Sequence, residues 1–160
     1  MLGIIRIVVV WCIIVAGVSE GIWGLMQVYG LVFCVQRPWV LDSRIEPNES
    51  ALEEATGYSF PSGHTQSGIT VFGCLALRFR TLAFRIFCVI CAVMIGVSRM
   101  YLGVHTPADV LTSFAIGVAV IFITEWLYNI CVKHDVATLV IGGVISIFMV
   151  AFALGITISP

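Results

Sequence analysis

Residues 83–130 read AFRIFCVICAVMIGVSRMYLGVHTPADVLTSFAIGVAVIFITEWLYNI and contain two long apolar runs, 83–101 and 107–130, joined by a short polar connection. Each run is close to the roughly 20 residues that an α-helix needs to cross the hydrocarbon core of a bilayer. The pair therefore predicts two membrane helices that turn back on each other at one membrane surface.

The whole chain shares this apolar character. Of its 160 residues, 60% are hydrophobic and 11% are charged, and the mean hydropathy is +1.09. Soluble domains carry about 25% charged residues, so the composition argues against a soluble fold and predicts an all-α, polytopic membrane helical bundle. The net charge of −1 provides no basic surface for nucleic acid, and no nucleic-acid partner is expected.

Apolar segments near the spanning length recur along the chain, at 3–18, 22–37, 61–78, 83–101, 107–130 and 138–157. The polar triplet Ser19-Glu20-Gly21 separates the first two, so we expect about six transmembrane helices in a single membrane-embedded domain, 1–160. The motif-bearing core covers about 22–130, and the segment at 138–157 is an additional C-terminal helix.

The one long polar stretch, 42–58, is expected outside the membrane. Ser50 and Glu53 have the spacing of a capping box and predict a short surface helix near 50–56. Pro61 suits the first turn of the helix that follows.

The six cysteines are scattered through apolar segments, which is typical of buried free thiols rather than a disulfide framework. Cys88 and Cys91 form an isolated pair inside one apolar segment, and we predict neither a redox nor a metal role for them. Glu125 lies within the fifth segment and is expected to snorkel to the interface or to contact another helix.

Basic residues indicate the orientation of the bundle. They gather after the third segment and after the fifth, at Arg78, Arg80, Arg85, Lys133 and His134. Short loops rich in Lys and Arg remain in the cytoplasm. The connections at 42–60 and 99–107 are then both predicted on the extracytoplasmic face.

Four residues of these connections are suited to binding a phosphate. Arg37 ends the second segment and Arg99 the fourth, and a guanidinium fork matches two phosphate oxygens. Ser62 and Gly63 open the third segment, where the exposed N–H groups of a first helical turn attract an anion. Gly63 also lets the backbone approach a ligand closely.

Two histidines supply the chemistry. Pro107 marks a helix start, so Asp109 lies in the first turn and can accept a hydrogen bond from one ring nitrogen of His105. The other nitrogen is then a nucleophile, and His64 is the general acid for the leaving oxygen. This predicts a phosphohistidine intermediate that water cleaves. No metal or cofactor is required, because two isolated histidines make a poor zinc site.

These residues resemble the phosphatidic acid phosphatase type 2 superfamily, which includes bacterial acid phosphatases and vanadium haloperoxidases. Arg37-Pro38 matches the end of the first family motif, and Pro61-Ser62-Gly63-His64 matches the second in full. Ser98-Arg99, His105 and Asp109 match the third with the family spacing. The resemblance implies that His105 is the nucleophile, Asp109 its partner and His64 the acid, with the phosphate held by Arg37, Arg99, Ser62 and Gly63.

The chain departs from the family pattern in two ways. The position of the family lysine is Gly30, so one phosphate cation is missing unless Arg44 or another residue replaces it. Membrane members of the family usually have two helices before the one that carries the first motif, and the predicted segments leave only one. The chain is therefore expected to be a shortened variant or part of a longer protein.

The leading hypothesis is an integral membrane lipid phosphatase with its site on the extracytoplasmic face of a bacterial plasma membrane. The substrates considered are phosphatidic acid, phosphatidylglycerol phosphate and an isoprenyl diphosphate. Gly30 motivates an alternative, a catalytically weakened or inactive relative that binds phospholipid head groups. A third hypothesis is a structural or transport subunit with vestigial motifs, and a vanadium-dependent peroxidase is disfavoured by the membrane core and the missing lysine.

Overall fold

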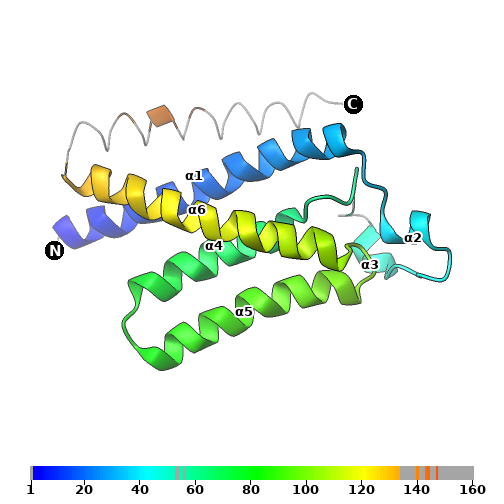
Figure 1. Cartoon of the computed structure of the whole chain (residues 1–160). Coiled ribbons are helices and arrows are strands. Elements are labelled where there is room, and N and C mark those ends of the chain that lie inside the picture. The colour runs from blue at the N-terminus through cyan, green and yellow to red at the C-terminus, as the bar shows by residue number, and fades with distance from the viewer. Residues whose placement is uncertain are drawn as a thin grey trace.

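The computed structural model describes residues 2–52, 55, 57–133, 140, 143–144 and 147, and every regular element among them is a helix. The all-α class predicted from composition is confirmed. Among these described residues, four long helices form a bundle and two short ones lie beyond its end (Figure 1). In chain order the elements are α1 (Leu2–Phe33), α2 (Pro38–Leu41), α3 (Glu49–Leu52), α4 (Gly63–Arg78), α5 (Leu82–Tyr101) and α6 (Pro107–Lys133).

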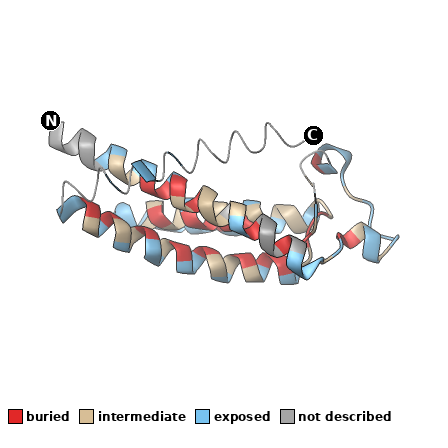
Figure 2. Cartoon of the chain, turned by 90° about the horizontal axis from the view of Figure 1, so that it is seen from above, coloured by how far each residue is buried: buried red, intermediate tan, exposed pale blue. Residues whose placement is uncertain are grey.

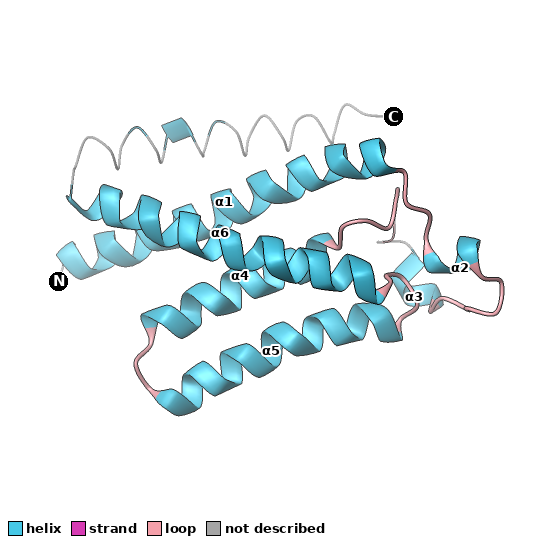
Figure 3. Ribbon diagram, in the orientation of Figure 1, coloured by secondary structure: helices cyan, strands magenta, loops and turns pink. Residues whose placement is uncertain are grey.

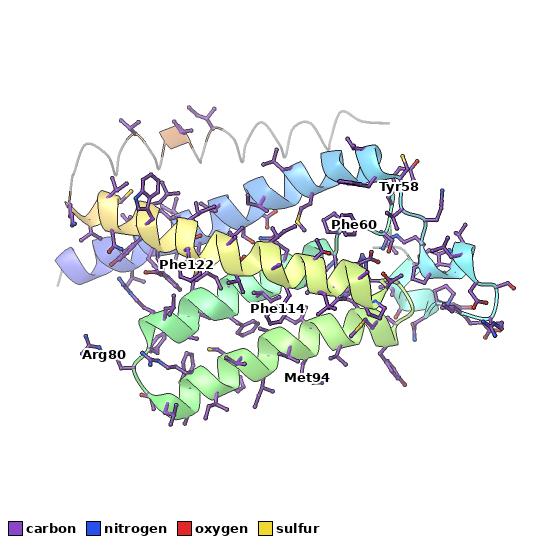
Figure 4. All side chains as sticks on the ribbon, viewed as in Figure 1. Tyr58, Phe60, Arg80, Met94, Phe114 and Phe122 are labelled. Atoms are coloured by element: carbon purple, nitrogen blue, oxygen red, sulfur yellow. The ribbon has the colours of Figure 1, made fainter. Side chains whose placement is uncertain are left out.

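Helix α4 is the centre of the bundle, because it packs against α1, α5 and α6. The chain connections collect at two ends (Figure 3). The N-terminus, the α4–α5 connection and the end of α6 share one end, whereas α2, α3 and the α5–α6 connection share the other. Tyr58 and Phe60 lie at this second end and Arg80 at the first (Figure 4). Both polar motifs are therefore at the same end of the molecule.

Helix α1 corrects the prediction of two separate segments at 3–18 and 22–37. It runs unbroken for 32 residues through Ser19-Glu20-Gly21. The triplet lowers the local hydropathy but contains no proline that would break a helix. Its glycine reduces helix stability by only about 1 kcal/mol. Ser19 is buried against the other helices, so packing retains the helix where hydropathy alone suggests a break.

Within the described residues, three helices are long and apolar enough to span a membrane, where about six were predicted for the whole chain. They are Val8–Met26 within α1, Leu82–Tyr101 and Pro107–Lys133. Helix α4 has 16 residues, and its buried face is polar, which fits its place among other helices rather than in lipid. The predicted segment 138–157 lies outside the described residues except at 140, 143–144 and 147.

Glycines allow the long helices to approach one another closely. A Cβ at Gly117 of α6 would come within 2.9 Å of the Ile69 side chain and 3.2 Å of the Gln66 carbonyl on α4. A Cβ at Gly96 of α5 would meet Val110 at 2.9 Å. Small residues at such contacts are characteristic of membrane helix packing. Figure 2 shows the result, with buried residues along the facing sides of the helices and exposed residues outward.

The short helix in the polar stretch also differs from its prediction. Its described residues are Glu49–Leu52, so it begins before Ser50, and its cap is Asn48 instead of Ser50. Residues 53, 54 and 56 of the predicted range 50–56 lie outside the described residues. The Asn48 Oδ1 atom accepts a hydrogen bond from the Ser50 N–H at 3.0 Å, which is a common N-cap geometry. Pro61 stands just outside α4, whose N-cap is Ser62.

Polar contacts also join the helices at the end of the bundle opposite the motifs. The Trp11 Nε1 donates to the Glu125 Oε1 at 3.5 Å, so of the two predicted roles of Glu125, snorkelling or contact with another helix, the structure shows the helix contact. The Arg78 guanidinium lies 4.2 Å from the centre of the Tyr128 ring, a cation–π geometry. These contacts tie α6 to α1 and to α4.

We predict that Gly117→Leu destabilises the bundle, whereas Ala115→Leu in the same helix does not. The added side chain at Gly117 must displace Ile69 or the α4 backbone, and overpacking typically costs about 1–3 kcal/mol. Ala115 is exposed, so its enlargement meets lipid or detergent. The measurement is the temperature at which helical circular dichroism is lost in detergent micelles. Equal values for the two variants would contradict the packing described above.

Candidate functional site

Arg37 joins three connections at the motif end of the bundle. Its Nε donates to the Gly57 carbonyl at 3.2 Å, and its Nη1 donates to the Val104 carbonyl at 3.0 Å. The side chain is buried, with 8% of its surface exposed. Pro38 follows at the first position of α2 and fixes the backbone where the arginine leaves it. A single guanidinium thus holds the segments before α2, before α4 and before α6.

Arg37 also contacts His105. Its Nη1 lies 3.3 Å from the His105 Nε2. Since a guanidinium has donors and no acceptor, the Nε2 must accept, and the ring proton of neutral His105 is on Nδ1. The Nε2 lone pair therefore points toward the Arg37 guanidinium. A phosphoryl group held by this guanidinium would lie next to a nucleophilic nitrogen.

Asp109 faces the other side of the His105 ring. Its Oδ2 lies 3.7 Å from the His105 Nδ1, which is longer than a hydrogen bond. The same Oδ2 accepts hydrogen bonds from the Ser59 hydroxyl and from the Thr106 N–H. Asp109 is in the first turn of α6, as the sequence predicts, and it is almost fully buried.

Thr106 and Asp109 form a reciprocal cap at the start of α6. The Thr106 N–H donates to the Asp109 Oδ2 at 2.7 Å, and the Asp109 N–H donates to the Thr106 Oγ1 at 3.3 Å. This is a capping box with aspartate in the position where glutamate is usual. The cap holds the Asp109 carboxylate in place independently of His105.

Burial and a neighbouring charge shift the pKa of Arg37 in opposite directions. Burial lowers the pKa of its guanidinium, and the negative charge of Asp109 partly offsets this shift. Arginine begins so far above neutrality that the group stays charged. The Arg37 guanidinium also lies 5.9 Å from the centre of the Trp39 ring, so the site holds a permanent cation beside an aromatic side chain.

Three of the other predicted residues, Gly63, His64 and Arg99, lie along a pocket of about 530 Å³. The pocket is bounded by α1, α4 and α5, and it is lined by Glu20, Gly63, His64, Ser67, Gly68, Val71, Phe72, Ile95 and Arg99. His64 is exposed and Arg99 half-buried. Ser62 is buried behind them, with its Oγ 2.9 Å from the Thr65 Oγ1.

The structure thus places the predicted site residues in two groups at one end of the bundle. Arg37, His105 and Asp109 form a buried cluster, whereas Gly63, His64 and Arg99 face the open pocket. The Val104 N–H donates to the Arg99 carbonyl at 3.3 Å, so the connection that carries His105 is tied to the end of α5.

Several contacts of the site were not predicted. The Ser59 hydroxyl, the Gly57 carbonyl and the Val104 carbonyl have no sequence signal, because any residue can supply a carbonyl and serine is common in loops. The spacing of Thr106 and Asp109 around Pro107 is a readable capping signal, and it could have identified the cap. Among the described residues, no three His, Cys, Asp or Glu side chains are grouped as metal ligands would be.

Gly30 packs against the loop that precedes the second motif. A Cβ at this position would lie 3.3 Å from the Phe60 carbonyl and 3.7 Å from the Tyr58 Cβ. A longer side chain could enter only if the loop shifted. Arg44, the alternative cation, is exposed and binds Asp42 at 2.7 Å. The charge of Arg44 is therefore directed to a neighbouring carboxylate.

Comparison with known proteins gives a family match over most of the chain. The model described as "PAP2 superfamily" matches residues 6–133. Phosphatidylglycerophosphatase B of Bacillus subtilis is 32% identical over 101 residues, which cover 57% of this chain and 48% of that protein. Undecaprenyl-diphosphatase BcrC of the same organism is 30% identical over 113 residues, 69% of this chain and 55% of that protein.

A third relative is lipid A 1-phosphatase of Rhizobium etli, which is 34% identical over 73 residues, 46% of this chain and 31% of that protein. The matched region thus spans about a third to a half of these relatives' length. No solved structure matches the chain.

We predict that Thr106→Ala weakens the start of α6 and that Thr106→Ser restores it. Loss of a hydroxyl N-cap typically costs about 1 kcal/mol, and serine keeps the oxygen that accepts from the Asp109 N–H. Hydrogen exchange of the amides in the first turn of α6, measured in detergent, reports the effect. Equal exchange in the alanine and serine variants would show that the cap does not hold this turn.

Proposed function

The chain belongs to the PAP2 superfamily, and on that premise we propose that it is a membrane lipid phosphatase that hydrolyses a lipid phosphomonoester or an isoprenyl diphosphate without a metal ion. The observation that carries this proposal is the contact of the Arg37 guanidinium with the His105 Nε2, with Asp109 on the opposite side of the ring. A nucleophile, its orienting carboxylate and a phosphate-binding cation then occupy one buried cluster. The relatives named above are lipid phosphatases and a diphosphatase by their descriptions.

The first step forms a phosphohistidine. The His105 Nε2 attacks phosphorus and a P–N bond forms while the P–O bond to the leaving group breaks. His64 gives its proton to the leaving oxygen. Asp109 stabilises the imidazolium that develops on His105. Arg37 transfers its hydrogen bond from the Nε2 to the phosphoryl oxygens, where a guanidinium stabilises the charge of the transition state.

The second step returns the enzyme to its starting state. A water molecule loses a proton to His64 and attacks phosphorus, and the P–N bond breaks to release inorganic phosphate. Arg99 and the first N–H groups of α4 hold the phosphoryl oxygens in both steps. Because Gly30 stands where the family has a lysine, one phosphate-binding cation is missing. Catalysis then relies on Arg37, Arg99 and the N-terminus of α4.

The position of the site suits a lipid substrate. It lies where the helices end, so a phosphate can bind in the site while the hydrocarbon tail remains in the bilayer. Arg78, Arg80, Arg85 and Lys133 lie at or near the opposite end of the bundle, and basic loops stay in the cytoplasm. We therefore place the site on the extracytoplasmic face of a bacterial plasma membrane.

We expect purified protein in detergent with EDTA to release phosphate from at least one of phosphatidic acid, phosphatidylglycerol phosphate and an isoprenyl diphosphate. His105→Ala should lower this rate by about a thousandfold or more, because the nucleophile is lost. His134→Ala is the matched control, since His134 belongs to neither motif, and it should keep the full rate. Acid quenching with labelled substrate should trap phosphate on the native chain and not on His105→Ala.

Two outcomes would contradict the proposal. Equal release by the native chain and by His105→Ala would exclude a phosphohistidine mechanism at this residue. Binding of the lipids without release by the native chain would favour the relative that binds phospholipid head groups.

We also predict that Ser43 and Thr81 lie on opposite sides of the membrane, with Ser43 outside. Both positions are exposed, and they belong to connections at opposite ends of the bundle. In a chain whose native cysteines are replaced, Ser43→Cys should react with a membrane-impermeant maleimide on intact cells. Thr81→Cys should react only after permeabilisation. The reverse pattern would place the site in the cytoplasm.

A further inference from the structure

The pocket beside the buried cluster extends well below the residues proposed to bind phosphate. His64 and Arg99 line it near the motif end of the bundle. Val71 and Phe72 line it too, and they follow His64 by about two turns of α4, or roughly 10 Å. The pocket therefore has room for a phosphate near His64 and for a substantial part of the leaving group further along.

Glu20 lies at the deep end of this pocket. Gly30 packs against the Phe60 carbonyl just before α4 begins, and Glu20 precedes Gly30 by ten residues, which is about 15 Å of helix. Because α1 and α4 run in opposite directions (Figure 1), this places Glu20 at the level of Val71 and Phe72. A carboxylate thus faces the part of the pocket that is otherwise apolar.

Glu20 lies within an apolar stretch, where a carboxylate is unfavourable in free energy. It is the only charged residue between Val8 and Met26, a stretch long and apolar enough to span a membrane. A carboxylate at such a depth is unfavourable unless it is paired or hydrated, and ionisable residues there usually serve a function. Within the part of the chain that the structure describes, no hydrogen bond or ion pair engages Glu20. Since Glu20 lines the pocket, its acceptor oxygens are available to a donor that fills it.

The pocket consequently has a polarity gradient, from the Arg99 cation and His64 at one end to the Glu20 carboxylate at the other. A phosphate is attracted to the first end and repelled from the second. A plain hydrocarbon chain would remove water from the carboxylate and offer no donor in return, which is unfavourable. A hydroxyl or amide N–H at this depth would instead donate to it.

We propose that Glu20 is a specificity-determining residue whose carboxylate accepts a hydrogen bond from a neutral donor in the leaving group. The substrate class is then a lipid phosphomonoester whose leaving alcohol carries further hydroxyl or amide groups, as glycerol- and sugar-based alcohols do. An isoprenyl diphosphate is disfavoured, since it would bring a second phosphate and an apolar tail into the pocket. This inference rests on the proposed phosphatase activity and narrows its substrate.

The test compares two soluble probes that differ in one hydroxyl group, octyl phosphate and ω-hydroxyoctyl phosphate. The native chain should prefer the hydroxylated probe by about tenfold in kcat/KM, the value of a hydrogen bond to a charged group. In Glu20→Leu this ratio should fall to about one, with octyl phosphate hydrolysed better than by the native chain. The ratio is taken within each variant, so it does not depend on the amount of folded protein.

Glu125→Leu is the matched control, because it removes another intramembrane carboxylate that bonds to Trp11 and does not line the pocket. Its ratio should equal that of the native chain. If Glu20→Leu does not fold, Glu20→Gln removes the charge at nearly constant size. That variant should lower the ratio about threefold and improve kcat/KM for farnesyl diphosphate.

The outcomes separate this inference from the proposed function. A ratio unchanged in both Glu20 variants, or no preference in the native chain, would overturn the role of Glu20 while the phosphatase activity stands. No phosphate release by the native chain from these probes or from any of the lipids would overturn the proposed function instead. In that case the binding of the two probes, measured by calorimetry, tests the role of Glu20. The native chain should bind the hydroxylated probe with a tenfold lower Kd, and Glu20→Leu should bind both probes equally.

Discussion

The buried guanidinium of Arg37 is the contact on which the motif end of the protein depends. It bonds to a carbonyl before α4, to a carbonyl before α6 and to the ring of His105. A buried cation is tolerated only when acceptors surround it, so these three connections must come together for the fold to form. The same requirement brings His105 next to a positive charge. One interaction therefore assembles the loops and fixes the guanidinium beside His105.

The packing of the long helices α1, α4, α5 and α6 holds the connections that Arg37 joins. Glycines in α5 and α6 bring their backbones close to neighbouring side chains, and the buried face of α4 carries Thr65, Gln66 and Thr70. Such polar residues are unfavourable against lipid and are better placed inside a bundle, and here they hydrogen-bond within α4 and to its N-cap, Ser62. Helix α4 is thereby held in the centre. The pocket between α1, α4 and α5 follows from this placement.

The helical class and the two motif regions were predictable from the sequence because each depends on local pattern. Apolar runs identified the helices at 83–101 and 107–130, and Pro107 located Asp109 in the first turn of the last one. The break predicted at Ser19-Glu20-Gly21 was wrong, because hydropathy measures affinity for lipid, whereas Ser19 is buried in the bundle and Glu20 lines a pocket. The cap at Asn48 was missed because two residues in that stretch have capping chemistry, and loop geometry decides between them.

The sequence alone determined the helical character of the chain, the family to which it belongs and the position of the motif residues along the chain, since these follow from the order and spacing of residues. The tertiary structure decided which atoms meet. The contacts of Arg37 with two backbone carbonyls, of Ser59 with Asp109 and of Glu20 with the pocket leave no trace in sequence spacing. They join residues far apart in the chain, and they exist only because helix packing brings those segments together.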